Sequence, residues 1–426
     1  MQRAALCATV AAVAFCVARL RRSSRRWHLF QRTLAVHHGQ DGLERDHVER
    51  YSRQMLVPSV GAGGQEALRD AAVLVIGAGG LGCPVLAFLA GAGVGRLGVA
   101  DGDRVEASNL HRQTLHSESW VGMLKVDSAR QAIKCLNKHV HVDTFAEHVD
   151  YQNVLQLVTQ FDVVVEASDS LACKYLVNDA CAMAGRPCVI GAAQGVAGQM
   201  MTCFPRQGCF RCVFPRPVSV ENRPNCADSG VLGPLPGIIG TMQALQVIHV
   251  LTDSKNTALG KYFYMFDGSA VMDMRKVKLP RREDCPSCSG SLKTMKASNA
   301  FCVENNLYAL CERPQQKVQR LEWVDLYRSN FEMENVLLLD VRSHVQVGIV
   351  SLNKALHIPF ADLESELDSI LRQTKGKLSL IIFCRRGIDS HKAAAFLQNE
   401  LAIPVFTITG GLEQLSRLFP DLIGLY

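Results

Sequence analysis

Beyond its first forty residues, the sequence carries almost no net charge. Residues 1–40 hold seven of the 46 Lys and Arg residues and none of the 40 Asp and Glu residues, which leaves 39 basic residues against 40 acidic ones. A nucleic-acid-binding protein usually shows a clustered excess of basic residues. The composition therefore gives no reason to expect direct nucleic-acid binding.

The leader, residues 1–45, lacks a long apolar run. Its apolar stretch, residues 4–18, is shorter than the roughly 20 residues that a membrane-spanning helix needs. Only Arg3 precedes this stretch, so the basic start of a strong signal peptide is missing, as is a clear cleavage site. Residues 1–40 of the leader are rich in Arg and contain no acidic residue, which resembles a transit sequence or a weak membrane anchor; a disordered extension or a misassigned start explains them equally well. We expect a cytosolic protein, with organelle targeting or membrane tethering as the alternative.

Internal repeats are also absent, and 426 residues suffice for two or three domains. The 16 cysteines are spread along the chain and include two CxxC pairs. This distribution favours a reduced compartment, in which thiols serve metal binding and catalysis, over a disulfide-rich secreted scaffold.

Short apolar runs alternate with helical patterns through the first two thirds of the chain. The predicted strands are Ala71–Ile76, Arg96–Asp101, Phe161–Ser168 and Val189–Ala193, with extended pieces at Tyr262–Asp267 and Met272–Leu279. The predicted helices are Leu81–Gly91, Val121–Lys138, Leu171–Gly185 and Gly237–Thr252. This alternation predicts an α/β fold with a doubly wound, mainly parallel sheet covered by helices on both faces.

A second, smaller alternation begins near Leu321. It contains the predicted strands Val336–Asp340, Leu378–Cys384 and Val405–Thr409 and the predicted helices Ala361–Gln373 and Asp389–Leu401. Residues 285–311 are rich in Pro, Ser, Gly and Asn and have little periodicity, which indicates a linker. We therefore expect a leader (1–45), a larger domain (46–290), a linker (291–320) and a smaller α/β domain (321–426).

A glycine-rich turn follows the first predicted strand. Gly77, Gly79 and Gly82 form a GxGxxG pattern between a strand and a helix, where backbone N–H groups can bind phosphate. Asp101 lies 19 residues past Gly82, at the end of the next strand, where a carboxylate can accept ribose hydroxyls. This arrangement fits NAD as well as ATP, and glycines that serve only helix–strand packing are the structural alternative.

The polar segment after Asp101 distinguishes the two nucleotides. It concentrates Asn109, Arg112 and Gln113, and Lys125 follows shortly afterwards. A nicotinamide pocket does not require these polar and charged residues. A triphosphate needs cations to neutralise its charge, and a divalent metal needs carboxylates as ligands. The segment therefore favours ATP with Mg²⁺ and argues against an NAD-dependent oxidoreductase.

Two CxxC pairs supply four thiols. Cys209 and Cys212 are separated from Cys285 and Cys288 by 72 residues. Four thiolates suit tetrahedral zinc, with no position left open for catalysis. We expect one structural Zn²⁺ that ties two distant segments together, although a single CxxC pair is often only a buried or redox pair.

Two other cysteines are candidate nucleophiles. Cys226 has polar neighbours, unlike a buried structural cysteine. Cys384 ends a predicted strand and is followed by Arg385 and Arg386 ahead of a helix, an environment that predicts a depressed thiol pKa. A cysteine phosphatase would have Arg where Ser390 stands, so phosphatase chemistry is disfavoured. Cys302 and Cys311 are either a redox pair or two free thiols.

From about residue 49 to 289 the chain closely resembles the MoeB/ThiF group of ubiquitin-activating-type adenylyltransferases. The matching segments are 50–54 (RYSRQ), 77–84 (GAGGLGCP), 101–116 (DGDRVEASNLHRQTLH), Lys125, Ser168-Asp169, 175–181 (YLVNDAC), 225–234 (NCADSGVLGP) and both CxxC pairs. Residues 338–343 (LLDVRS), 356–359 (LHIP), 409–411 (TGG) and the loop after Cys384 resemble a rhodanese domain.

This resemblance implies roles for individual residues. It assigns ATP binding to Gly80, Asp101, Ser108, Asn109, Leu110, His111, Arg112, Lys125, Asp169 and Ser170. It also implies a homodimer in which Arg53 reaches the ATP phosphates of the neighbouring subunit. Ser170 stands where relatives commonly have Asn. Cys226 corresponds to the cysteine that forms a thioester, although Pro224 and Ser229 stand where relatives often have Thr and Gly.

The resemblance further implies the reaction. ATP would convert the C-terminal glycine of a ubiquitin-like sulfur-carrier protein ending in Gly-Gly into an acyl-adenylate. Cys384, charged as a persulfide by a donor such as a cysteine desulfurase, would then supply sulfur for a thiocarboxylate. The implied partners are the small subunit of molybdopterin synthase and the ubiquitin-related modifier of tRNA thiolation, or one of these alone. A non-catalytic scaffold is disfavoured, because Arg112, Lys125, Cys226 and Cys384 are all present.

Overall fold

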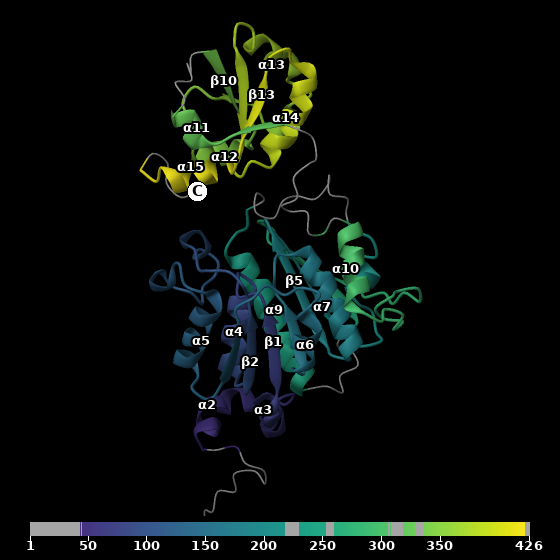
Figure 1. Cartoon of the computed structure of the whole chain (residues 1–426). Helices are drawn as coiled ribbons and strands as arrows, with labels where there is room; N and C mark the ends of the chain where they lie inside the picture. The colour runs from purple at the N-terminus through teal and green to yellow at the C-terminus, as the bar shows by residue number, and fades with distance from the viewer. Residues whose placement is uncertain are drawn as a thin grey trace, which may run out of the picture.

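The computed structural model contains two sheets, each with its own helices (Figure 1). The structure describes Leu43, residues 45–217, 230–252, 260–305, Leu307, residues 318–328 and 335–421. The larger unit comes first in the chain, and the smaller one carries the C-terminal residues. The predicted α/β class with a smaller second α/β unit is confirmed.

The larger sheet has eight strands in the order β3-β2-β1-β4-β5-β6-β7-β8. They are β1 (Ala72–Ile76), β2 (Arg96–Ala100), β3 (His141–Phe145), β4 (Val163–Glu166), β5 (Cys188–Gln194), β6 (Ala197–Cys203), β7 (Tyr262–Asp267) and β8 (Asp273–Lys278). The strands from β3 to β5 in this order pair in parallel, and β6, β7 and β8 extend the sheet antiparallel. The mainly parallel part is the part that the alternation predicts. The antiparallel extension ends at β8, which among the described residues pairs with β7 alone.

Helices cover both faces of this sheet. The helices are α2 (Arg45–Met55), α3 (Gly61–Asp70), α4 (Gly82–Ala92), α5 (Lys125–Leu136), α6 (Val154–Thr159), α7 (Leu171–Ala184), α8 (Phe210–Val213), α9 (Pro234–Thr252) and α10 (Met295–Glu304). Apolar residues of α3, α4, α5 and α9 form one core with the sheet, and residues of α6, α7, α8 and α10 form the other. β1 is buried between these cores, because Val73, Leu74 and Val75 face opposite sides in turn and none is accessible to solvent.

The helix predicted from Val121 begins later than the pattern suggests. Gly122 has a φ of 86°, and Leu124 is extended, so α5 starts at Lys125. The late start places Lys125 in the first turn of the helix, next to the carboxyl end of β2.

Helix α10 corrects part of the linker prediction. Residues 295–304 form a helix that packs against α7, and Ser298 and Cys302 are fully buried. The linker prediction is wrong for these residues. The buried face of this helix carries a serine and a cysteine, so its apolar periodicity is weak and the sequence pattern does not reveal it.

The smaller unit has five parallel strands in the order β11-β10-β12-β13-β9. They are β9 (Gln319–Leu321), β10 (Val336–Asp340), β11 (Leu356–His357), β12 (Ser379–Phe383) and β13 (Val405–Ile408). The helices are α11 (Trp323–Arg328), α12 (His344–Ile349), α13 (Leu367–Gln373), α14 (Asp389–Glu400) and α15 (Gly411–Leu418). The predicted helix at residues 361–373 is split into a 3₁₀ turn (Phe360–Asp362) and α13.

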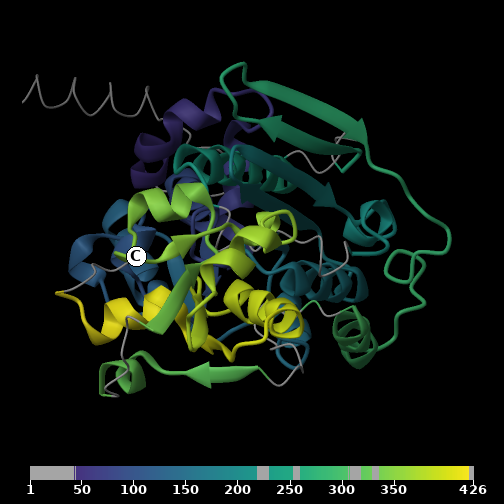
Figure 2. The same ribbon diagram turned by 90° about the horizontal axis from the view of Figure 1, so that it is seen from above.

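The smaller unit lies beyond the edge of the larger sheet where its parallel strands end (Figure 1). Viewed from above, it lies in front of the larger unit, and the hairpin of β7 and β8 is seen at one side (Figure 2). Because α/β sheets bind their ligands at the carboxyl ends of parallel strands, this is the edge at which a nucleotide site is expected.

Candidate nucleotide site and metal centre

The glycine-rich turn leaves β1 in a conformation that only glycine accommodates. Gly77 has a φ of 95°, and a Cβ on it would lie 2.9 Å from the carbonyl oxygen of Ala167. A Cβ on Gly82 would lie 1.9 Å from the carbonyl oxygen of Gly77. The turn is therefore closely packed, and α4 begins at Gly82 without a side-chain cap on its first N–H groups. Uncapped N–H groups at a helix start are suited to bind an anion.

Asp101 links this turn to the end of β2. Its two carboxylate oxygens accept hydrogen bonds from the backbone N–H groups of Ala78 and Asp103, each at 2.8 Å. The Nζ of Lys125 lies 4.0 Å from Asp101 and 2.8 Å from Asp103. Lys125 is buried, so its side-chain nitrogen is held next to the glycine turn with little water around it.

The polar loop after Asp101 packs on the other side of the turn. Ser108 and Asn109 lie at the 3₁₀ turn Ala107–Asn109, which leads through Leu110 and His111 to Arg112. Nη1 of Arg112 donates to the carbonyl oxygen of Ser108 at 3.2 Å and lies 2.7 Å from Nε2 of His111. The loop is therefore held by its own hydrogen bonds.

Gly80 lies between this loop and α9. A Cβ on Gly80 would lie 3.1 Å from Cβ of Pro236 and 3.5 Å from Cγ of Arg112. Burial lowers the pKa of Arg112. The carboxylates of Asp169 and Glu106 raise this pKa, and Arg385 of the smaller unit lowers it. The two arginines are thus close enough to interact, although they come from different units.

Beside the turn, the amide oxygen of Gln113 is buried without a hydrogen-bond partner among the described residues. The Nε2 of Gln113 lies 3.7 Å from the position that a Cβ on Gly79 would occupy. His116 is also buried; it lies 2.8 Å from both the carbonyl oxygen of Ala78 and Oγ of Ser128, and its pKa is lowered by burial. An unsatisfied buried acceptor beside a glycine turn and a buried cation fits a polar ligand such as a nucleotide. The sequence reasoning assigned no role to His116.

The end of β4 is held by a buried ion pair that the sequence reasoning also missed. Glu166 is fully buried and forms an ion pair with Lys174 of α7, and it accepts hydrogen bonds from the N–H and hydroxyl of Ser168. Burial raises the pKa of Glu166, and Lys174 opposes that shift. Lys174 Nζ also donates to the carbonyl oxygens of Ser168 and Gly191, at 2.8 and 2.7 Å. This network fixes the loop that carries Asp169.

Asp169 itself is exposed, and Ser170 caps the next helix. The Oγ of Ser170 accepts a hydrogen bond from the N–H of Cys173 at 3.2 Å. Ser and Asn are both favoured at this position of a helix, so the departure from the common Asn preserves the cap.

Arg53 does not join these residues within one chain. It is exposed in the last turn of α2, which packs on α3. Both helices lie at the opposite end of the larger unit from the smaller one (Figure 1). The predicted contact of Arg53 with a neighbouring subunit stays a prediction.

The four cysteines of the CxxC pairs lie together and are buried. All four Sγ atoms are within 4.8 Å of one another, with distances of 3.9 Å for Cys209–Cys212, 3.6 Å for Cys209–Cys285 and 3.5 Å for Cys212–Cys288. Tetrahedral Zn–S bonds of about 2.3 Å would place the sulfurs about 3.8 Å apart. The hydrogen bond from Cys209 lowers the pKa of Cys212 to about 6, which favours a thiolate there. The donor set therefore fits a bound metal ion.

Cys384 lies at the carboxyl end of β12, as predicted, but its pKa shift is opposite to the prediction. The N–H of Gly387 donates to its Sγ at 3.1 Å, and Ser390 also stabilises the thiolate. Burial outweighs both and raises the pKa of the Cys384 thiol. The expectation of a depressed pKa is wrong because the side chain is only 4% exposed, and desolvation penalises the charged form.

Cys226 and Cys311 lie outside the described residues, and Cys302 is fully buried in α10. The predicted role of Cys226 and a pairing of Cys302 with Cys311 therefore stay predictions.

Comparisons with known proteins agree with this arrangement. The ThiF family matches residues 51–287. The mouse protein named adenylyltransferase and sulfurtransferase MOCS3 is 40% identical over 400 residues, which are 87% of this chain and 85% of the mouse protein. The protein of the same name from Arabidopsis thaliana is 37% identical over 395 residues, 87% of this chain and 84% of the relative. This chain belongs to the ThiF family.

Solved structures give the same fold for the ThiF-family unit. MccB from E. coli has a TM-score of 0.51 with 21% identity, over 58% of this chain and 75% of that one. A second structure, of MccB with AMPCPP and MccA, has a TM-score of 0.51 with 23% identity over the same shares. The relatives match 87% of this chain, so the match extends beyond the ThiF-family residues into the smaller unit. The protein is therefore an enzyme that catalyses adenylyl transfer and sulfur transfer.

Within this ThiF-family chain, the structure brings most of the predicted nucleotide residues to one edge of the sheet. Gly80 belongs to the glycine turn, Asp101, Arg112 and Lys125 lie beside it, and Asp169 is close enough to Arg112 to affect its pKa. Their individual contacts with ATP stay predictions.

Proposed function

We propose that the chain adenylylates the C-terminal glycine of a ubiquitin-like sulfur-carrier protein ending in Gly-Gly and then converts that carboxylate into a thiocarboxylate. The observation that carries this proposal is that buried Lys125 lies beside the glycine turn in the larger unit, while Cys384 ends β12 in the smaller unit, in a loop whose Gly387 N–H donates to its sulfur. The smaller unit lies beyond the edge of the larger sheet at which this turn is found (Figure 1). A sulfur carried by Cys384 would then meet a carboxylate activated at that turn.

In the first step, the carboxylate attacks the α-phosphorus of ATP and pyrophosphate leaves. Lys125, Arg112 and the neighbouring subunit's copy of Arg53 would offset the negative charge on the phosphates, and Asp101 would accept the ribose hydroxyls. Asp169 would hold Mg²⁺, which neutralises phosphate charge when bound. Ser108, Asn109, Leu110, His111, Gly80 and Ser170 would line the nucleotide. The resulting mixed anhydride is a much better electrophile than the carboxylate.

In the second step, the outer sulfur of a Cys384 persulfide attacks the acyl-adenylate, and AMP leaves. The product is an acyl disulfide on Cys384. Cys226 then attacks the sulfur of Cys384, which releases the thiocarboxylate and leaves a disulfide that a cellular thiol reduces. A thioester on Cys226 before sulfur transfer is the alternative order. The persulfide would come from a donor such as a cysteine desulfurase.

The four-cysteine centre would hold one Zn²⁺ in a structural role. All four positions of a tetrahedral ion are taken by Cys209, Cys212, Cys285 and Cys288, which leaves none open for substrate. The active form would be a homodimer, because Arg53 cannot serve its own chain's site from the far end of the unit.

The biological role would be sulfur supply for molybdenum cofactor biosynthesis and for 2-thiolation of the tRNA wobble uridine, or for one of them. The carrier proteins would be the small subunit of molybdopterin synthase and the ubiquitin-related modifier. We place the enzyme in the cytosol, with targeting through residues 1–40 as the alternative.

The test incubates the full-length protein with ATP, Mg²⁺, a persulfide donor and a carrier protein ending in Gly-Gly, and then weighs the carrier. Replacement of one oxygen by sulfur adds about 16 Da. The substitution Cys384→Ala should abolish this gain, and Cys135→Ala, at an exposed cysteine on α5, should not change it. A carrier that gains the mass with Cys384→Ala as fast as with the unaltered enzyme would exclude Cys384 as the sulfur carrier.

A further inference from the structure

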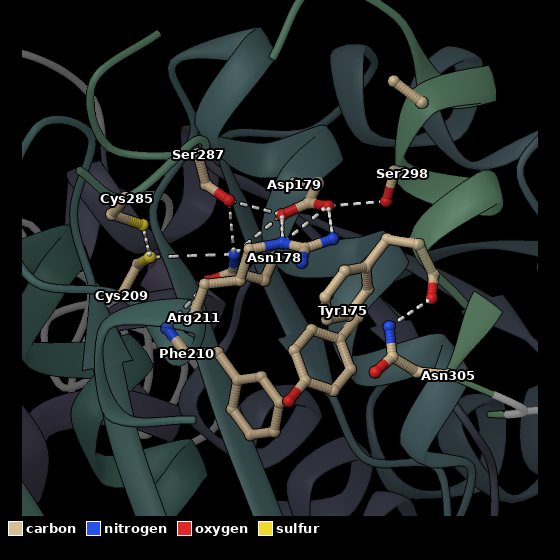
Figure 3. Close-up of polar contacts among 12 residues, drawn as sticks. Tyr175, Asn178, Asp179, Cys209, Phe210, Arg211, Cys285, Ser287, Ser298 and Asn305 are labelled. Atoms are coloured by element: carbon tan, nitrogen blue, oxygen red, sulfur yellow. Dashed lines mark hydrogen bonds and ion pairs between the residues drawn. The ribbon is translucent and has the colours of Figure 1, made fainter. Parts of the chain in front are cut away.

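A buried polar network centred on Asp179 of α7 lies beside the four cysteines (Figure 3). Asp179 is fully buried, and its carboxylate receives hydrogen bonds from three separate segments of the chain. Arg211 donates from Nε at 2.8 Å and from Nη2 at 2.7 Å. Ser287 and Ser298 each donate a hydroxyl at 2.5 Å. A buried carboxylate with so many charge-assisted bonds holds its partners in one arrangement.

Two of these donors lie inside the metal-binding motifs. Arg211 stands between Cys209 and Cys212, and Ser287 stands between Cys285 and Cys288. Asn178, the neighbour of Asp179, donates to Sγ of Cys209 at 3.8 Å and accepts from the N–H of Phe210 at 2.9 Å. These residues therefore form the layer that orients the four sulfurs, as outer partners of metal ligands do.

The third donor lies in α10. Ser298 is fully buried on the face of α10 that meets α7, and the ring of Phe301 lies 3.9 Å from the guanidinium carbon of Arg211. Tyr175 contributes a second ring, 5.1 Å from the same carbon. Arg211 is thus enclosed by Asp179 and two aromatic rings, one of which belongs to α10.

Helix α10 is the last helix or strand of the described residues before β9, with which the smaller unit begins. Its packing therefore sets the position from which the chain runs toward the unit that carries Cys384. Ser298 is linked to the metal-binding segments through Asp179, and Phe301 contacts one of them directly at Arg211.

We infer that Asp179 is a positioning residue that transmits the state of the metal centre to α10. With the metal bound, Arg211 and Ser287 are fixed, Asp179 is held between them, and Ser298 is held in turn. Without the metal, the two CxxC segments separate and α10 loses its attachment. The metal would then support sulfur transfer, which needs the smaller unit in place, more than adenylylation. This last consequence rests on the proposed function.

The first experiment measures amide hydrogen exchange in the full-length protein before and after removal of metal by a chelator. We expect the exchange rate of residues 295–304 to rise about tenfold when the metal is removed and to return to its first value when zinc is added. A tenfold rise is the effect expected from the loss of one hydrogen bond to a charged group. In the metal-loaded Asp179→Asn variant, exchange in these residues should already be raised and should no longer respond to the chelator. Unchanged exchange in residues 295–304 after metal removal would overturn the inference, whatever reaction the enzyme catalyses.

The second experiment uses a milder change, in case Asp179→Asn does not fold. Ser298→Ala removes only the bond to α10. Ser291→Ala removes an exposed hydroxyl from the loop after the second CxxC pair, where its hydrogen-bond partner among the described residues is Ser289. We expect Ser298→Ala to keep its metal and its ATP–pyrophosphate exchange, to show raised amide exchange in α10, and to form thiocarboxylate about fivefold more slowly. Ser291→Ala should match the unaltered protein. An equal loss of both reaction steps in Ser298→Ala would mean general destabilisation and would overturn the coupling.

Discussion

Lys125 lies 2.8 Å from Asp103 and 4.0 Å from Asp101, and it is buried at the start of α5. Asp101 in turn accepts the N–H of Ala78 in the glycine turn. Lys125 is therefore fixed beside the turn by Asp103, next to Asp101, the carboxylate that is bonded to the turn. An anionic ligand at the turn would meet a positive charge that needs no rearrangement, which is the arrangement that stabilises charge in a transition state.

Substitution of Lys125 by Met should remove this charge with little change in packing. We expect ATP–pyrophosphate exchange to fall by about 10²- to 10³-fold, the effect of removing one preorganised charged donor. Lys134→Met, at an exposed position of the same helix, should leave the rate within about twofold. A Lys125→Met enzyme with normal exchange and a native circular dichroism spectrum would show that this lysine does not act on the phosphates.

Ser170→Ala should destabilise the larger unit by about 1 kcal/mol, because the N–H of Cys173 loses its cap. Ser170→Asn should restore the cap and leave the free energy of unfolding within about 0.5 kcal/mol of the unaltered protein. Urea denaturation measures both. If Asn proves as destabilising as Ala, capping is not the function of this side chain.

The buried Cys384 thiol should react slowly at neutral pH. Burial raises its pKa above the ordinary value, so the thiolate fraction is small at pH 7 and grows as the pH rises. The rate of alkylation by iodoacetamide, followed by mass spectrometry of the peptide that contains Cys384, should increase up to at least about pH 9 without a plateau. Ser390→Ala removes a hydrogen bond that favours the thiolate and should slow the reaction further. A plateau near pH 7 would show that the thiol is already ionised there.

Loss of one metal ligand should release the metal and destabilise the larger unit. We expect Cys285→Ser to contain much less than one zinc per chain and to unfold about 6 °C lower or more, which corresponds to a loss of about 2 kcal/mol in a domain of this size. Cys302→Ala changes a buried thiol of α10 that is not one of the four, and it should keep its zinc. Full metal content in Cys285→Ser, measured by atomic emission, would contradict the assignment.

The parts of the fold that the sequence predicts well are those set by local pattern. β1 is an uninterrupted apolar run, and β10 is apolar up to its last residue, Asp340; both form within one residue of their predicted bounds. The turn at Gly77 and Gly82 is fixed by steric limits that only glycine meets, and the CxxC pairs are recognisable by spacing. Each of these features depends on neighbours in the sequence.

The features that were missed depend on distant packing. Ser298 is buried in α10 because Asp179 lies across from it, 119 positions earlier, and no local pattern carries that information. The pKa of Cys384 is raised by the burial of its whole strand, which the adjacent arginines did not reveal. Lys174 is buried because it forms an ion pair with the buried carboxylate of Glu166 at the end of β4. Buried polar partners of this kind become visible only when the chain is folded.

The antiparallel end of the larger sheet leaves β8 as an edge strand with exposed apolar side chains, among them Met274 and Val277. Such an edge offers free backbone groups to the strand of another molecule and is a common starting point for aggregation. In β8 the apolar residues are interleaved with Arg275, Lys276 and Lys278, all exposed. Like charges on two such edges would repel when the strands approach. The exposed lysines and arginine of β8 therefore oppose the pairing of two such edges.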